Sequence, residues 1–385
     1  MAENQITVRL VESAKAHHQF LDLPYQLYKH HPYWVPPLRM AQKDILNIQK
    51  HPFYKAADVE LFLAFRNEKP VGRIMAIVNH AANQFHHEQA GHFGFFECEN
   101  NFVTAQALFD AARHWLRERG MTVMRGPFNP STNYECALLV QGFDSSPTVM
   151  MPYNFDYYAA LFEQYGFTKA MDLMAYDISL ETFNYSEKLG RVAERLKNKY
   201  RIKVRTIDLK KFASEVETVR RIYNDAWSNN WGFVPVSDDE FQHIAKDLKQ
   251  IVDSQVVFVA EQLSEDGKTS TPIAFFLAIP DINLALKKVT DGRLLPFGLI
   301  KLLWHSRKID FIRIVTMGVV KDHQNLGIAA VFYDEIYKHA AQVGKYPKGE
   351  MSWILENNLM MNRSAELIGG KIAKVYRIYE KSIGD

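Results

Sequence analysis

The sequence is poor in cysteine and in uninterrupted apolar runs. Its 385 residues include two cysteines, Cys98 and Cys136, which are too few for a disulfide scaffold or a cysteine-based zinc site. The nearest approach to a membrane span, residues 294–304, carries Lys301 and is shorter than the roughly 18 apolar residues a span needs. Residues 1–10 lack the apolar core of a signal peptide. The sequence therefore predicts a cytoplasmic protein.

An excess of charge of one sign is also missing. Lys and Arg number 46 against 44 Asp and Glu, which gives a net charge of +2. Proteins dedicated to DNA or RNA carry a broad positive field, so we expect no nucleic-acid partner. Histidine pairs such as 17–18 and 30–31 lack the spacing and the carboxylate support of a metal site, so we expect no metal.

Apolar patterning instead predicts alternating strands and helices. Alternation of apolar and polar residues predicts two hairpins, 59–66 with 70–78 and 256–262 with 272–279. Apolar residues at helical spacing predict long helices over 103–119 and 328–343. The fold class is therefore α/β (α+β).

The order of these elements repeats along the chain. Trp34-Val35-Pro36 and the segment 231–235 (WGFVP) each precede a helix and then a hairpin. We interpret this as a duplication, with domains at 1–183 and 184–385 and an insertion at 281–310. The alternative is a loose match between two unrelated α/β halves.

One strand-to-helix junction carries chemistry. A strand ends at Met317-Gly318-Val319, and residues 324–329 (QNLGIA) lead at once into the helix 328–343. Such a turn presents successive backbone N–H groups at a helix N-terminus, which is an anion site. The pattern is neither a P-loop nor the dinucleotide motif. The alternative is an ordinary strand–turn–helix connection.

This junction resembles the coenzyme A signature of the GNAT superfamily of N-acetyltransferases, Gln/Arg-x-x-Gly-x-Gly/Ala. Gln324, Gly327 and Ala329 fill its defined positions, and the resemblance covers 203–381. It implies two tandem acyl-CoA N-acyltransferase-like domains, each with a mixed, mostly antiparallel sheet flanked by helices. It also implies coenzyme A or an acyl-CoA as co-substrate, bound by Met317, Gly318, Val319, Gln324, Asn325, Leu326, Gly327, Ile328, Ala329 and Asn358.

The first half resembles the same fold without the motif. Glu97 and Glu99 stand where the loop would be, and their charges would repel a pyrophosphate. We therefore expect one coenzyme A site, in the second half. More loosely, the segments 292–298 and 377–380 resemble bacterial ceramide synthase-like acyltransferases, which implies N-acylation of a sphingoid base.

The resemblance also bears on the catalytic groups. The family's usual tyrosine acid falls here on Ala365, so that acid is missing. Tyr333, Tyr337 and Tyr376 are alternatives, or the thiolate leaves unassisted. For the general base we choose Glu356, which ends the penultimate strand, and a plain surface carboxylate is the alternative.

A long irregular segment of the first half supplies the acceptor candidates. Glu135 is the second catalytic candidate, and Asn133 and Tyr134 are candidates for binding the amine, as is Trp231 in a loop of the second half. The alternatives are hydrogen bonds that stabilise the loop and, for Trp231, simple packing.

The insertion combines apolar and basic side chains over 293–308. That composition is typical of an interfacial helix or a wall around a long acyl chain, and equally of a core-packing helix. We hypothesise that this element serves a lipid substrate or the membrane surface, and the second role would make the protein peripheral to the inner membrane.

These observations predict an acyl-CoA-dependent N-acyltransferase whose partners are an acyl-CoA and an amine, which is a long-chain lipid amine on the looser resemblance. One alternative is a non-catalytic acyl-CoA-binding or regulatory protein, because the tyrosine acid is missing. The other is an aminoacyl-tRNA-dependent transferase, which would not need an intact pyrophosphate loop.

Overall fold

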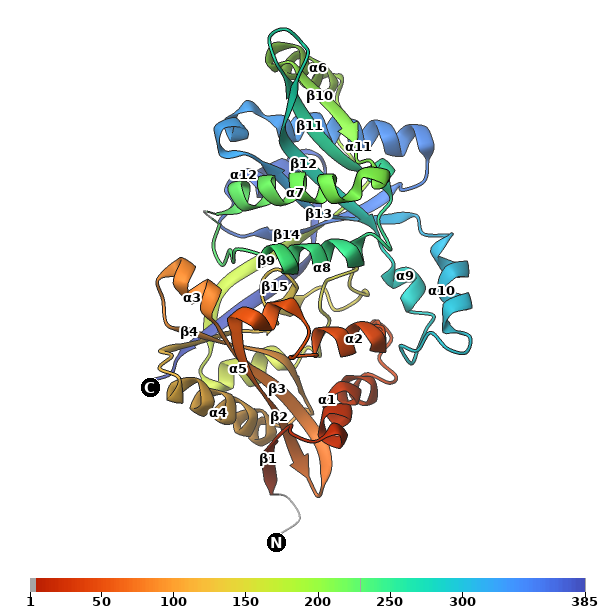
Figure 1. Ribbon diagram of the computed structural model, residues 1–385. Helices are drawn as coiled ribbons and strands as arrows, with labels where there is room; N and C mark the ends of the chain where they lie inside the picture. Colours follow the sequence, from red (N-terminus) through yellow and green to blue (C-terminus); the bar gives the residue numbers. More distant parts are fainter. Residues whose placement is uncertain (1–4, 229, 385) are drawn as a thin grey trace. The chain divides into compact units, whose positions relative to one another are not determined.

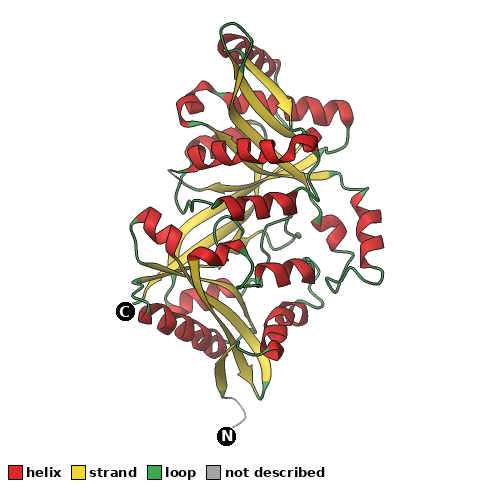
Figure 2. Cartoon of the chain, viewed as in Figure 1, coloured by secondary structure: helices red, strands yellow, loops and turns green. Residues whose placement is uncertain are grey.

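The computed structural model describes residues 5–228 and 230–384 (Figures 1 and 2). Residues 1–4, part of the segment for which no signal peptide is predicted, lie outside this range. The fold is mixed α/β with mostly antiparallel strands flanked by helices, as predicted. Contacts divide the chain into two compact units. Unit 1 comprises Met1–Leu173, Asn283–Arg307 and Lys374–Asp385, and unit 2 comprises Met174–Ile282 and Lys308–Ala373.

Unit 1 has a twisted run of neighbouring strands. Neighbours are antiparallel from β1 to β4, whereas β4 and β5 are parallel. The hairpin predicted at 59–66 and 70–78 is confirmed, and Asn67 and Glu68 take positive φ in its turn. The strands are β1 (Ile6–Leu10), β2 (Ala57–Arg66), β3 (Lys69–Asn79), β4 (Ala90–Cys98) and β5 (Val123–Gly126).

Two helices cover opposite faces of these strands. Side chains alternate between the two faces along β2, so its successive residues contact different helices. Phe62 and Ala64 pack in one cluster with Phe109 of α4 (Phe102–Glu118), whereas Leu61 and Leu63 pack with Phe20 of α1 (Ala14–Leu27). The predicted helix 103–119 is thus confirmed.

Unit 2 repeats this arrangement. Its strands are antiparallel neighbours from β10 to β13, and β13 and β14 are parallel. Val259 and Phe275 pack with Ile222 of α7 (Phe212–Trp227), and Phe276 on the other face contacts Phe332 of α11 (Ile328–Val343) at 5.8 Å between ring centroids. The strands are β10 (Ile202–Thr206), β11 (Val257–Leu263), β12 (Ser270–Pro280), β13 (Phe311–Val319) and β14 (Lys348–Leu355).

The strand that closes each sequence half contributes to the other half's unit. The end of β15 (Lys371–Ser382) pairs antiparallel with β5 in unit 1, from Tyr379↔Gly126 to Ser382↔Val123. In unit 2, β9 (Thr168–Ser179) neighbours β14, and Leu180 N–H donates to Pro347 at 2.8 Å. The compact units are therefore discontinuous in sequence. The predicted boundary at 183/184 separates the two halves of the proposed duplication, and it stays a prediction.

The remaining elements connect these layers. The sequence reading missed α3, whose N-terminus is capped by the Asn79 side chain. Among residues 5–228 and 230–384, no helix has both the length and the apolarity to cross a bilayer. The other elements are α2 (Arg39–Ile45), α3 (His80–His86), β6 (Phe128–Asn129), β7 (Glu135–Cys136), β8 (Leu138–Gln141), α5 (Tyr158–Tyr165), α6 (Glu187–Tyr200), α8 (Asp238–Leu248), α9 (Asn283–Leu286), α10 (Gly298–Ser306) and α12 (Leu359–Leu367), with 3-10 turns η1 (Pro52–Ala56), η2 (Leu209–Lys211), η3 (Ser254–Val256) and η4 (Lys321–Leu326).

Candidate functional site

The two parallel strands of unit 2 separate towards their C-terminal ends. Pairing between β13 and β14 runs from Phe311↔Lys348 to Ile314↔Met351, yet β13 continues to Val319 and β14 to Leu355. The edge of β13 beyond Ile314 thus turns from its parallel neighbour. Met317 to Val319 lie in the part of β13 beyond its last pairing with β14, and their role in binding pantetheine stays a prediction.

A register shift accompanies this separation. Leu277 pairs with Thr316 and Ala278 with Ile314, so Val315 is an extra residue on β13. Beyond the bulge, Gly318 lets the ring of Trp227 approach, because a Cβ there would lie 2.4 Å from that ring. Gly318 therefore also serves packing, a role that the sequence pattern did not indicate.

The loop after β13 ends at an open helix terminus. Gly327 has φ +76°, a conformation that favours glycine, and it is the N-cap of α11. No side chain within the described part of the chain caps this helix. The first N–H groups of α11 therefore have no side-chain acceptor, which is the state expected of a helix that receives an anion.

Side chains of the loop hold its backbone in place. Lys321 N–H donates to the Asp225 carboxylate at 2.7 Å, and Gln324 Nε2 donates to the Val319 carbonyl at 3.2 Å. A nitrogen of His323, Nε2, lies 3.1 Å from Gln262 Oε1. Gln324 therefore shapes the loop through its amide, while Asn325 is exposed and Leu326 half-buried.

The turn after β14 lies at the same end of unit 2, because the two strands are parallel. Glu356 and Asn358 are half-buried there, and the Asn358 side chain caps α12 by accepting from Met361 N–H at 3.2 Å. Asn362, one helical turn later, donates Nδ2 to the carbonyls of Leu355 (2.9 Å) and Asn358 (3.0 Å).

A buried tyrosine completes this turn. Tyr176 of β9 donates its hydroxyl to Asn362 Oδ1 at 2.9 Å. Burial raises the pKa of Tyr176, so its proton is held at neutral pH. Asn362 and Tyr176 were not singled out from the sequence, although the spacing of Asn358 and Asn362 by one helical turn was visible there.

The alternative tyrosines for the missing acid have separate surroundings. Ala365 is fully buried, and beside it Ser364 donates Oγ to the hydroxyl of Tyr333 at 3.2 Å. Burial raises the pKa of Tyr333 to about 12. Tyr337 stacks on Tyr185 at 4.1 Å between centroids. Tyr376 is fully buried in the part of β15 that belongs to unit 1.

The acceptor candidates of the long loop lie in unit 1. Glu135 pairs with Asn129 in the short ladder of β6 and β7, and Asn133 N–H donates to Ser131 Oγ at 3.2 Å. The Tyr134 ring lies 5.7 Å from that of His51. All three candidates are half-buried, and Glu135 is close enough to raise the pKa of Glu97, although burial is the larger cause.

Trp231, the fourth acceptor candidate, belongs to unit 2. It lies half-buried in the turn between α7 and α8, next to Asn230, whose N–H donates to Trp227 at 2.8 Å.

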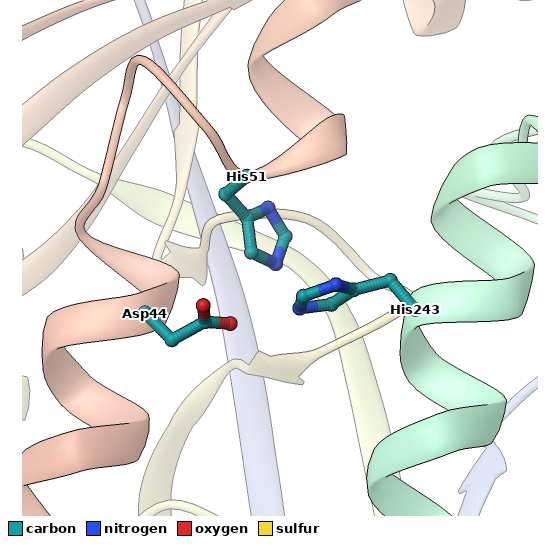
Figure 3. A group of neighbouring side chains, drawn as sticks. All are labelled: Asp44, His51 and His243. Atoms are coloured by element: carbon teal, nitrogen blue, oxygen red, sulfur yellow. The ribbon is translucent and has the colours of Figure 1, made fainter.

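Three side chains of metal-ligating type are drawn in Figure 3. Asp44 of α2 and His51 belong to unit 1, and His243 of α8 belongs to unit 2. Within unit 1, His51 is buried, and its Nδ1 accepts from Phe53 N–H at 3.4 Å. The expectation of no metal stays a prediction.

Unit 1 has its own version of the strand–loop–helix junction. β4 and β5 pair only from Ala90↔Val123 to His92↔Arg125, so these strands separate as well. Here the opening is filled: Asn129 Oδ1 accepts from Phe95 N–H at 2.6 Å, and a Cβ on Gly94 would lie 1.6 Å from the Phe128 carbonyl.

The helix that follows β4 is capped by its own side chains. Asn101 accepts from the N–H groups of Val103 (3.0 Å) and Thr104 (3.3 Å). Glu99 next to it accepts from the Thr104 hydroxyl at 2.7 Å and is paired with Arg66. An anion would meet satisfied donors and a carboxylate at this terminus.

This chain is similar to known proteins in sequence and in fold. No family model matches it. It is 37% identical over 371 residues to the bacterial ceramide synthase of Caulobacter vibrioides (strain NA1000 / CB15N), covering 95% of this chain and 94% of that protein. It is 34% identical over 369 residues to protein YghO of Escherichia coli (strain K12), covering 94% and 92%. A tandem GNAT protein from the clavulanic acid biosynthesis pathway superposes with a TM-score of 0.56 at 9% identity, covering 99% of both chains.

The structural likeness establishes the fold, and the sequence likeness establishes the family. The suspected resemblance to tandem GNAT proteins and to ceramide synthase-like acyltransferases is confirmed. Family and fold together support an acyltransferase. The chain belongs to the family of the bacterial ceramide synthase, built on the GNAT fold.

Proposed function

We propose that the protein transfers an acyl group from a coenzyme A thioester to the amine of a long-chain lipid base. In this reaction the amine nitrogen attacks the thioester carbon, a C–N bond forms and the C–S bond breaks. The thiolate of coenzyme A leaves and takes a proton from water, while the proton lost by the amine passes through the base to water, so that charge and protons balance.

One observation carries the proposal: the uncapped N-terminus of α11 beside the separating ends of β13 and β14. A pyrophosphate would accept from the N–H groups at Gly327, Ile328 and Ala329, where the helix dipole favours negative charge. Backbone N–H groups of Met317 to Val319 would bind the pantetheine arm and polarise the thioester carbonyl. Asn358, already the cap of α12, keeps its amide Nδ2 as a donor for coenzyme A.

The base and the acceptor residues are proposed on position. Glu356 follows β14 at the open end of the parallel pair, where an amine approaching the thioester would lose its proton. Asn133, Tyr134 and Trp231 stay the residues proposed to bind the amine, and Glu135 stays the alternative base. With Ala365 in place of a tyrosine, we propose that the thiolate leaves without a dedicated acid and takes its proton from water.

The nature of the amine rests on the relative's name. A protein called a bacterial ceramide synthase is 37% identical to this chain over nearly its full length. The lipid base is therefore proposed to be a sphingoid-type amino alcohol, and the site of action the cytoplasmic face of the inner membrane.

Release of free coenzyme A thiol, followed with a thiol reagent, tests the proposal. Acetyl-CoA and palmitoyl-CoA are each combined with sphinganine, spermidine or no amine, and the product is identified by mass spectrometry. We expect thiol release and an N-acyl amide with sphinganine. Binding of acyl-CoA in calorimetry without thiol release for any amine would instead support a non-catalytic binding protein.

Two further outcomes separate the remaining alternatives. Failure to bind either coenzyme A or acyl-CoA would overturn the proposal and favour an aminoacyl-tRNA-dependent transferase. Glu356→Gln keeps the size of the side chain and removes the base. We expect it to lower kcat about 100-fold with little change in acyl-CoA affinity. Glu135→Gln is the matched variant. A larger loss of kcat in Glu135→Gln than in Glu356→Gln would make Glu135 the general base.

A further inference from the structure

The insertion after β12 begins with a segment anchored to the body of unit 1. Asn283 Nδ2 donates to the Pro147 carbonyl at 3.0 Å, and Lys287 Nζ donates to Ser146 Oγ at 2.8 Å. Arg39 donates its backbone N–H to Gly292 at 2.9 Å and its Nε to the Asp291 carbonyl at 2.8 Å. These bonds fix residues 283–292 as a base.

Close packing at one residue reinforces this base. Gly292 has φ +67°, and a Cβ there would lie 2.4 Å from the Pro37 carbonyl and 2.9 Å from the Tyr25 ring. The guanidinium of Arg39 lies 4.0 Å from the centre of that same ring. Any larger residue at 292 would displace the base from the body of unit 1.

Beyond this base, residues 293–307 form an apolar tip. α10, which makes up most of it, has no buried residue. Leu295 is 77% exposed, Ile300 66% and Trp304 56%. Phe297, Leu299 and Leu303 are exposed as well. A helix that packs in a core would bury its apolar face, so the core-packing interpretation of this segment is wrong.

The exposed residues share one face of α10. At 3.6 residues per turn, Leu299, Ile300, Leu303 and Trp304 lie on one side, and the half-buried Leu302 and His305 lie on the other. Leu295 and Phe297 extend the apolar surface past the N-terminal end of the helix. The tip thus exposes several large apolar side chains on an anchored base.

The charged side chains of the tip indicate what kind of surface it binds. Arg293, Lys301 and Arg307 are exposed around the apolar surface, and residues 293–307 contain no Asp or Glu. An apolar face bordered by cations, with a tryptophan on it, matches an interface of acyl chains beneath anionic headgroups.

We propose that the apolar tip, residues 293–307, docks the protein on an anionic phospholipid bilayer. The apolar face enters the boundary between headgroups and acyl chains, and the three cations contact the phosphates. This surface is separate from the coenzyme A loop in the chain, and its binding requires no acyl-CoA. Failure of vesicle binding is therefore distinguishable from failure of the proposed reaction.

Co-sedimentation of the full chain with vesicles tests the proposal. One vesicle is phosphatidylcholine alone, and the other contains phosphatidylcholine and phosphatidylglycerol. We expect binding to the anionic vesicle. The double variant Leu299→Glu/Leu303→Glu should reduce the partition coefficient by at least about 100-fold. Lys301→Gln and Arg307→Gln should each weaken binding roughly fivefold on the anionic vesicle only.

Met40→Glu/Val103→Glu is the matched control, because it places the same charges at two exposed apolar positions of unit 1 outside the tip. It should bind vesicles like the unchanged protein, and circular dichroism checks that every variant folds. Unchanged vesicle binding by Leu299→Glu/Leu303→Glu would overturn the proposal. Two other results would also overturn it. In the first, the unchanged protein is a dimer in light scattering that does not bind vesicles, and Leu299→Glu/Leu303→Glu dissociates this dimer. In the second, the double variant weakens only the affinity for palmitoyl-CoA.

Discussion

The β4–α4 junction of unit 1 and the β13–α11 junction of unit 2 have the same topology. They differ in whether side chains accept from their backbone N–H groups. In both, a parallel pair of strands separates and a helix follows. In unit 1 the Asn129 side chain takes the strand's free N–H and Asn101 caps the helix. In unit 2 no described side chain caps the helix. The two junctions therefore differ in whether side chains of the chain itself already accept from their backbone N–H groups.

A buried acidic residue, Glu97, also lies near this junction of unit 1. The Glu97 carboxylate accepts from the hydroxyls of Tyr28 (2.9 Å) and Tyr158 (2.8 Å) and lies 3.9 Å from the Arg73 guanidinium. Burial raises the pKa of Glu97 and lowers that of Arg73. Groups that would repel a pyrophosphate are here part of the packing.

The largest effect is expected from breaking this buried pair. Arg73→Met removes the cation and leaves the Glu97 carboxylate in the core, which should lower the free energy of unfolding by about 3–5 kcal/mol. Chemical denaturation measures this loss. The double variant Arg73→Met/Glu97→Gln should recover part of it. Unchanged stability combined with lost acyl-CoA affinity would instead give this cluster a role in binding.

The comparison of helix termini is tested by placing the same charge at both. Ala329 and Val103 are each the second residue of their helix. Ala329→Glu should weaken coenzyme A binding about 100-fold, since a carboxylate would face the pyrophosphate. Calorimetry measures the affinity. Val103→Glu, at the capped terminus of α4, should leave it unchanged, and equal losses in the two variants would contradict the proposed single site.

A pH effect is expected from unit 1. Burial, then the charges of Arg125 and His86, lowers the pKa of His92 on β4 to about 3. The unfolded chain binds this proton near pH 6.5, so the stabilising contribution is complete above that value and falls as the pH drops towards 3. Between pH 7 and pH 5 the loss is about 2 kcal/mol. Denaturation of His92→Leu at both pH values should show a correspondingly smaller difference, and an identical difference would argue against a buried neutral imidazole.

The smallest effect concerns the filled opening of unit 1. Asn129→Ala leaves the Phe95 N–H without its acceptor, which should cost about 1–2 kcal/mol of unfolding free energy. Asn129→Asp keeps the acceptor and should cost less. If calorimetry of Asn129→Ala showed a second coenzyme A site, the Asn129 side chain alone would be what prevents coenzyme A from binding at the opening of unit 1.

Much of the local structure could be predicted from the sequence. The helix 328–343 was predicted with its observed bounds, because its apolar spacing and the flanking Gly327 and Gly344 are local signals. The glycine loop was likewise visible as a motif. The packing of Trp227 under Gly318, and the Tyr176–Asn362 bond behind the turn after β14, join residues far apart in sequence and had no local signal.

The sequence by itself determined most of the elements, their order and the glycine loop before the helix 328–343, since hydrophobic periodicity and glycine conformation act over a few residues. The tertiary structure decided which strands close each unit, because β15 pairs with β5 and β9 neighbours β14, and these partners are far apart in sequence. It also decided that residues 283–307 belong with unit 1 and expose an apolar tip. Apolar composition can serve a core or a surface equally well, and only packing distinguishes the two.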